Sequence, residues 1–313
     1  MIFSHLPVLL EECMQGLALK DGGTYFDGTC GGGGHSYEIL RRTSRSRLIA
    51  TDLDEEALRA AGERLAPFAG RYRLHHANYK QFAAVLDEEG VGGLDGVLLD
   101  FGVSSYQLDE PARGFSYGKD APLDMRMDQS APFTAADVVN GYGEEKLAQI
   151  FRDYGEERFA RPIAARIVRE RAKEPIVRTG RLASVVTEAI PAKFRYGGPP
   201  ARKVFQAIRI EVNGELDGLE EAVRGLALRL NKGGRICVLT FHSLEDRIVK
   251  NVFRDLASGC VCDKRLPVCV CGRTKELEII THRPVTAGEE ERKNNHRSSS
   301  AKLRIAERVT EYK

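Results

Sequence analysis

The stretch Gly23-Thr-Tyr-Phe-Asp-Gly-Thr-Cys-Gly-Gly-Gly-Gly-His35 decides how the rest of the chain is organised. Its apolar start suits a buried strand, and its glycines permit positive φ and let a ligand approach bare backbone. About twenty residues further on, Arg47-Leu-Ile-Ala-Thr-Asp52 predicts a second strand that ends in a carboxylate, the group that grips ribose hydroxyls in a βαβ unit. The sequence therefore predicts a nucleoside ligand.

Two nucleoside cofactors compete for such a unit. The dinucleotide fingerprint G-x-G-x-x-G/A fails, because Ser36 and Tyr37 stand where its third small residue belongs, and this counts against NAD. The pattern Asp27-x-Thr29-x-Gly31-x-Gly33 instead resembles the S-adenosylmethionine loop of class I methyltransferases, in which no pyrophosphate has to be held. A glycine-rich surface turn is the structural alternative, and the carboxylate of Asp52 counts against it.

Length and charge narrow the class of protein. The 313 residues suffice for one large domain or two ordinary ones. We expect no membrane span and no signal peptide, and hence a cytoplasmic protein, because no apolar run approaches the required length. Residues 1–150 carry 14 lysine and arginine against 23 aspartate and glutamate residues, whereas residues 151–210 carry 14 against 6. A basic block beside an acidic one favours a polyanionic partner.

Alternating strands and helices predict an α/β fold. The further expected strands are 71–76, 94–100, 235–241, 277–281 and 302–306. The alternation is interrupted by the expected helices 134–140, 144–153, 157–173 and 179–190. We therefore predict a Rossmann-like, class I methyltransferase domain formed by 1–108 and 211–313, with an inserted all-helical domain at 109–210. The polar stretch 288–300 is expected to be mobile unless RNA orders it.

Around the fourth strand the chain resembles one family closely. Leu98-Leu-Asp-Phe-Gly-Val-Ser-Ser-Tyr-Gln-Leu108 is similar to the corresponding motif of the RsmH/MraW methyltransferases. The other matching segments are Asp27 to His35, Arg113 to Ser116, Pro122 to Asp128, Tyr154 to Ala160, Phe205 to Asn213, Phe241 to Lys250 and Ala301 to Arg308. These enzymes methylate N4 of a cytidine in 16S ribosomal RNA, in the decoding region of the small subunit, and the resemblance implies the same activity here.

The resemblance also implies where S-adenosylmethionine binds. The implied cofactor-binding residues are Gly33, Gly34, His35, Asp52, Tyr79, Asp100 and Gln107. Asp100 and His242, which end the fourth strand and follow the fifth, are the candidates for catalysis. Amino-methyltransferases commonly place an acid, two prolines and an aromatic residue after the fourth strand, and Asp100-Phe-Gly-Val keeps the acid and the aromatic residue only. Asp100 thus either accepts a hydrogen bond from the target amine or holds the cofactor's amino-acid portion.

The inserted domain carries the residues expected to bind RNA. Arg158–Lys173 is a basic helix, and Lys193–Lys203 mixes basic side chains with Phe194 and Tyr196, which offer faces for unstacked bases. An ordinary solvated helix is the structural alternative. A binding protein with a degenerate pocket and a methyltransferase acting on DNA or protein are the functional alternatives. The oligomeric state, including a homodimer, and the assembly state of the substrate remain open.

Four of the seven cysteines form a C-x-C-x6-C-x-C array, Cys260, Cys262, Cys269 and Cys271. Four thiols at this spacing are able to close a tetrahedral zinc site, although the spacing is tighter than the usual C-x-x-C. A reduced cluster without metal is the alternative. The other three cysteines, Cys13, Cys30 and Cys237, are expected to be buried as small apolar residues.

Overall fold

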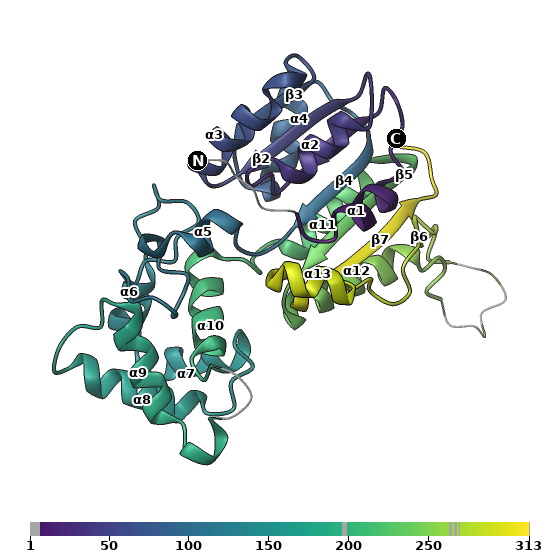
Figure 1. The fold of residues 1–313 in the computed structure, drawn as a ribbon. Coiled ribbons are helices and arrows are strands. Elements are labelled where there is room, and N and C mark those ends of the chain that lie inside the picture. Colours follow the sequence, from purple (N-terminus) through teal and green to yellow (C-terminus); the bar gives the residue numbers. More distant parts are fainter. Residues whose placement is uncertain (1–6, 196–198, 263–264, 266–267, 269, 313) are drawn as a thin grey trace. The chain divides into compact units, whose positions relative to one another are not determined.

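The computed structural model describes residues 7–195, 199–262, 265, 268 and 270–312, and they form two compact units (Figure 1). The sheet unit comprises the chain up to Gly102 and from Gly218 onward, and the helical unit comprises Val103–Asp217. The expected insertion, 109–210, lies within the helical unit. The unit extends beyond it because the strand before it ends at Asp100 and the helix that crosses residue 210 continues to Asn213.

The sheet unit is built on seven strands: β1 Thr24–Asp27, β2 Arg47–Asp52, β3 Tyr72–His76, β4 Leu94–Asp100, β5 Leu230–Thr240, β6 Leu277–Ile279 and β7 Lys302–Arg308. Their order is β3-β2-β1-β4-β5-β7-β6. Strands β1 to β5 are parallel, and β7 runs antiparallel to both of its neighbours. The order reverses between β1 and β4, so the carboxyl ends of these strands open the crevice where α/β sheets bind ligands.

Helices cover both faces of this sheet (Figure 1). One face carries α1 Leu10–Leu17, α2 Gly34–Arg41 and α3 Glu55–Leu65, and the other carries α4 Phe82–Glu88, α11 Leu219–Leu228 and α12 Ser243–Ala257. The central strands β1, β2 and β4 are buried along most of their length, as parallel strands covered by helices on both faces are expected to be. Position 96 in β4 requires a glycine for close packing, because a Cβ there would lie 2.7 Å from the buried ring of Tyr25.

The expectation of a mobile segment at 288–300 is wrong. It contains helix α13 Glu289–Asn294 and the 3-10 turn η5 His296–Ser300. Its three leading glutamates complement the positive end of the helix dipole. Glu291 also accepts a 2.8 Å hydrogen bond from the backbone N–H of Leu9, and Ser298 is 1% exposed. These contacts attach the polar segment 288–300 to the start of α1. The amino-acid composition of the segment does not indicate this attachment.

The helical unit contains α5 Ser105–Asp109, α6 Ala135–Gly141, α7 Glu144–Asp153, α8 Ala160–Arg171, α9 Thr179–Ala189 and α10 Arg202–Asn213 around its own apolar core. The four expected helices are confirmed as α6 to α9, whereas α10 was not predicted as a helix. Its last residue, Asn213, clamps the loop before α6 by bonding to the backbone of Met125 and Met127 at 2.8 and 2.7 Å. Among the described residues no helix is both long and apolar enough to span a bilayer.

Candidate active site

Three acidic side chains stand at the carboxyl ends of three adjacent parallel strands. Asp27 ends β1, Asp52 ends β2 and Asp100 ends β4, and β1 lies between the other two strands. The sequence predicted these strand ends, and the parallel sheet brings them to one edge. Each of the three carboxyls has a different set of partners, so each can do different chemistry.

Asp27 is buried below the glycine-rich turn and stabilises it through hydrogen bonds. Its side chain is 1% exposed and accepts hydrogen bonds from the backbone N–H of Thr29 at 3.2 Å and from the Ser36 hydroxyl at 2.6 Å. Burial raises the pKa of Asp27 to about 6, against the effect of these donors. Because both oxygens are engaged inside the protein, Asp27 shapes the turn and the start of α2.

Asp52 joins the turn to the second strand. It accepts hydrogen bonds from the backbone N–H of Gly31 at 2.7 Å and of Asp54 at 2.9 Å. Burial raises the pKa of the Asp52 carboxyl. A carboxylate offers about four acceptor positions, so these two bonds do not exhaust its capacity for hydroxyl donors.

Asp100 is the least satisfied of the three carboxyls. Its backbone N–H donates to the Thr29 hydroxyl at 2.5 Å, and its carboxylate lies 3.7 Å from Nδ1 of His35. Burial, with the negative charges of Asp27 and Glu245, raises the pKa of Asp100 to about 8. Burial also lowers the pKa of His35 to about 4, and its Nε2 lies 3.2 Å from the Val8 carbonyl. His35 is therefore neutral at pH 7. A cation bound next to Asp100 would stabilise the Asp100 carboxylate, whose burial is otherwise unfavourable.

The glycines of the turn differ in what they permit. A Cβ on Gly33 would lie 3.2 Å from the Ala61 backbone, and one on Gly34 would lie 2.5 Å from the Pro7 ring. Both positions require glycine, because the start of α2 packs against these residues and leaves no room for a side chain. Gly31 has φ +51° and open space where its Cβ would be. The accessible side of the turn is thus at Gly31, which the sequence analysis did not place among the cofactor-binding residues.

An aromatic pair borders the same edge. Tyr79 begins the 3-10 turn Tyr79–Gln81 after β3, and its ring centroid lies 5.3 Å from that of Phe101, which follows β4. Gly28 permits this arrangement, since a Cβ there would lie 2.8 Å from Cβ of Tyr79. The two rings are tilted by 41° to one another, and Phe101 is buried, so Tyr79 is the more accessible ring of the pair.

His242 and Gln107 have local structural roles. His242 caps α12, with Nδ1 accepting from the Glu245 backbone N–H at 3.4 Å and Nε2 lying 3.1 Å from the Glu245 carboxylate. Gln107 lies in the helical unit and forms the capping box of α5, where its side chain accepts from the Ser104 backbone N–H at 2.9 Å. Thr29 was part of the predicted loop pattern, but its hydrogen bond with Asp100 was not predicted. Ser36, which donates to Asp27, was not predicted to belong to the site.

Three of the four cysteines in the array converge. The sulfurs of Cys260, Cys262 and Cys271 all lie within 4.8 Å of one another, and Cys269 lies outside the described residues. The remaining cysteines, Cys13, Cys30 and Cys237, are 0–5% exposed, as expected for apolar core residues. Burial raises the pKa of all three thiols, so they remain protonated.

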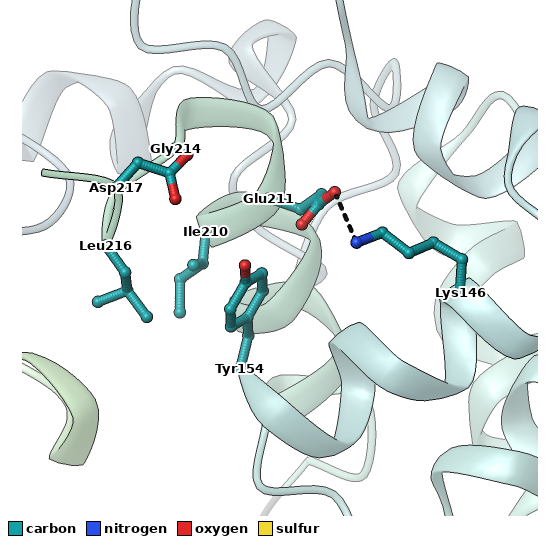
Figure 2. Close-up of a pocket in the computed structure, with 7 residues that line it drawn as sticks. All are labelled: Lys146, Tyr154, Ile210, Glu211, Gly214, Leu216 and Asp217. Carbon is teal, nitrogen blue, oxygen red and sulfur yellow. Dashed lines mark ion pairs between the residues drawn. The ribbon is translucent and has the colours of Figure 1, made fainter.

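The helical unit contains a cavity of about 250 Å³ that was not predicted (Figure 2). It is lined by Lys146, Tyr154, Ile210, Glu211, Gly214, Leu216 and Asp217. Lys146 Nζ lies 3.9 Å from Glu211, which also accepts a 2.8 Å hydrogen bond from the Tyr142 hydroxyl. Two carboxylates against one ammonium make this cavity unsuitable for a phosphate and suitable for hydrogen-bond donors.

The seven-stranded sheet with its acidic, glycine-rich edge defines a class I, S-adenosylmethionine-dependent methyltransferase fold, as the sequence predicted. The chain belongs to the MraW methylase family, whose sequence model matches residues 2–309.

Similar proteins cover almost the full chain. Ribosomal RNA small subunit methyltransferase H of Symbiobacterium thermophilum is 56% identical over 97% of this chain and 96% of its own length. The protein of the same name from Carboxydothermus hydrogenoformans is 52% identical over 99% of both chains. A solved structure, described as an rRNA methylase from Streptococcus thermophilus, is 11% identical over 98% of this chain and 100% of its own, with a TM-score of 0.41.

Asp100 should lower the stability of the ligand-free protein at alkaline pH. The folded state retains a proton that the unfolded chain releases above its ordinary pKa of 3.8, so this group's contribution to stability falls as pH rises from about 4 to about 8. Asp100→Asn should therefore gain about 4 kcal/mol more at pH 8.5 than at pH 5 in urea unfolding, because about 1.4 kcal/mol is lost for each pH unit between 5 and 8. Asp87→Asn, whose side chain is 67% exposed, is the control. A gain independent of pH would show that Asp100 is not protonated.

Proposed function

We propose that this chain transfers a methyl group from S-adenosylmethionine to the exocyclic N4 of a cytidine in the decoding region of 16S ribosomal RNA. The observation that carries the proposal is the placement of Asp100 and Phe101, a carboxyl and an aromatic ring, after β4 of a methyltransferase sheet. Support for the substrate comes from the relatives named as ribosomal RNA small subunit methyltransferases. The small ribosomal subunit is the implied partner.

The residues at the sheet edge fit S-adenosylmethionine. Asp52 keeps acceptor capacity for ribose hydroxyls beside the open side of the turn at Gly31. The pair formed by Tyr79 and Phe101 offers a surface for adenine. Asp100, whose pKa is raised by burial, gains from the cofactor's ammonium group. The bound cofactor supplies a methyl group activated by a cationic sulfur.

The remaining proposed contacts follow the family resemblance. Gly33 and Gly34 would offer backbone groups to the cofactor at the start of α2. His35 would lie near the cofactor, because its ring is beside Asp100. Gln107 is the other residue that the resemblance implies, and within the helical unit its side chain caps α5. Asp27 lies beneath the turn with both oxygens engaged, so it would position these residues without touching the cofactor.

The reaction imposes two demands on the site. The N4 lone pair of cytosine is conjugated with the ring, so the amine needs a hydrogen-bond acceptor while the nitrogen becomes pyramidal, and it needs in-line alignment with the methyl group. We assign Asp100 to the cofactor's ammonium. We assign His242 a positioning role, because its ring caps α12 through Glu245.

RNA binding is assigned to a basic and aromatic patch on the helical unit, composed of Arg158, Phe159, Lys193 and Phe194. The Arg158 guanidinium lies 5.1 Å from the Phe194 ring centroid, and Lys193 Nζ lies at the same distance from it. The rings of Phe159 and Phe194 are 5.2 Å apart, and Phe194 is 41% exposed. Cations around an exposed ring suit a phosphate next to an unstacked base. Tyr196, also expected to contact bases, lies outside the described residues.

The patch is a better candidate than the basic face of α8. Arg166 pairs there with Glu170 and Glu188, and Glu170 also contacts Lys173 and Arg181. Reversing the charge of Arg166 would break contacts between α8 and α9 whether or not RNA binds. Arg158 and Lys193 can be changed with less risk to the fold, since both residues are exposed.

The proposed activity is tested by incubating the protein with S-adenosylmethionine labelled in its methyl group and with 30S subunits, naked 16S RNA, DNA or a protein mixture. We expect label in RNA, recovered after nuclease digestion as N4-methylcytidine. Label in DNA or in protein, or on another atom of the RNA, would overturn the proposal. Binding of RNA without transfer of label would indicate the alternative, an assembly protein with an inactive pocket.

Asp100→Asn separates the two roles of this carboxyl. If Asp100 holds the cofactor, the variant should bind S-adenosylmethionine about 10- to 100-fold more weakly, because a hydrogen bond to a charged group is lost. Its single-turnover rate should then recover at saturating cofactor. A persistent deficit of about a hundredfold at saturation would instead indicate that the carboxylate acts on the target amine.

If the patch binds RNA, removing its charges and removing its aromatic ring should affect RNA binding in different ways. Arg158→Glu with Lys193→Glu should weaken RNA binding and reduce its salt slope by at least about 1.4, the value for two lost phosphate contacts on a single strand. Phe194→Ala should cost about 1–3 kcal/mol of RNA binding with the slope unchanged. Arg152→Glu, an exposed change on α7, is the control, and cofactor affinity should not change. Equal losses in the control and the patch variants would remove RNA binding from this patch.

A further inference from the structure

We propose that Cys260, Cys262 and Cys271 bind a zinc ion that fastens together the two arms of the segment between α12 and β6. Cys260 and Cys262 lie on the arm that leaves α12, and Cys271 lies on the arm that leads to β6. Their sulfurs are within 4.8 Å of one another, and those of Cys260 and Cys271 are 3.8 Å apart. Tetrahedral coordination with Zn–S bonds of 2.3 Å places sulfurs about 3.8 Å apart, so these two are already at coordination distance.

None of the described residues of the segment from 258 to 276 is buried, so apolar packing among them does not hold these thiols together. The described residues between Ser258 and Glu276 form neither helix nor strand. Its valines point outward, with Val261 54%, Val268 70% and Val270 77% exposed. A loop without an apolar core needs another source of stability, which in small structures is commonly a metal or a disulfide.

The base of the segment is closed independently of the cysteines. Glu276 donates its backbone N–H to the Leu256 carbonyl at 2.9 Å, and the Arg273 guanidinium donates to the Asp255 carboxylate at 2.8 Å. These bonds bring the two arms together next to α12 and β6. The cysteines stand further along both arms, where an ion would provide the second point of attachment.

Backbone N–H groups point at two of the sulfurs. Cys262 donates its backbone N–H to Sγ of Cys260 at 3.4 Å, and Val270 donates to Sγ of Cys262 at 3.3 Å. Hydrogen bonds of this kind stabilise the charged form of a group, here the thiolate that a metal requires. Thiolate ligands favour zinc over harder ions such as magnesium. Each thiol that binds releases its proton, so affinity should fall in acid.

This inference is independent of the proposed function, because none of the three cysteines belongs to the sheet edge that carries Asp52 and Asp100. It is tested on the full chain, purified under reducing conditions and stripped with a chelator. Zinc is then added, and the bound metal is measured by mass spectrometry. Cobalt(II) is added in a parallel sample, in which thiolate coordination produces charge-transfer absorbance in the near ultraviolet.

We expect one zinc per wild-type chain and a thiolate-to-cobalt band. Cys260→Ser, Cys262→Ser and Cys271→Ser should each weaken zinc binding by about a hundredfold or more, because loss of a ligand exceeds the 10- to 100-fold effect of losing an outer partner. Val270→Ser introduces the same side chain at an exposed position of the segment and should leave zinc binding unchanged. Cofactor affinity should be the same in all variants.

Three results would overturn the inference. One is a reduced wild-type chain that takes up no zinc, and another is a triple serine variant that binds zinc as tightly as wild type. The third is iron in place of zinc in the purified protein, which would indicate a cluster of another kind. Because the variants are measured by metal content and absorbance, a chain with no methyltransferase activity would still give a clear answer.

Discussion

The crowding of three carboxyl groups at one edge of a parallel sheet is the constraint on which the sheet unit depends. Asp27, Asp52 and Asp100 end neighbouring strands, and burial raises the pKa of each. The protein stabilises the first two with backbone N–H groups and a hydroxyl, and it leaves the third with little compensation. The glycine-rich turn, the start of α2 and the position of Thr29 all follow from satisfying these acids. In the proposed function, the ammonium group of the cofactor would compensate the third carboxyl.

The fold could be predicted from sequence because its signals are local and repeated. The central parallel strands β1, β2 and β4 are short and mostly buried runs that each end in an aspartate, so both the strands and their carboxyl ends were recognisable. Helix α10 was not predicted, although its buried apolar residues recur at a helical spacing. The segment at 288–300 was misjudged because polar composition does not show a tertiary contact such as the one between Glu291 and Leu9.

The candidate site could be predicted only in part. The sequence indicated Asp52 and Asp100 through their strands, but it did not show that Gly33 and Gly34 face protein while Gly31 faces open space. It also did not show that the ring of His242 caps a helix. Such distinctions depend on what lies opposite a residue in space, and no spacing rule along the chain contains that information.

The helical unit interrupts the chain between two strands that pair at the centre of the sheet. Gly96 in β4 pairs with Arg235 in β5, so closing the sheet joins residues that are far apart in sequence. Asn213 contacts the loop at Met125 and Met127, so a helical unit that has already folded shortens the chain that must be closed. Loop-closure entropy grows as 3/2 RT ln n, which makes this shortening worth about 1 kcal/mol. A helical unit that folds early on the ribosome would thus lower the entropic barrier to pairing β4 with β5.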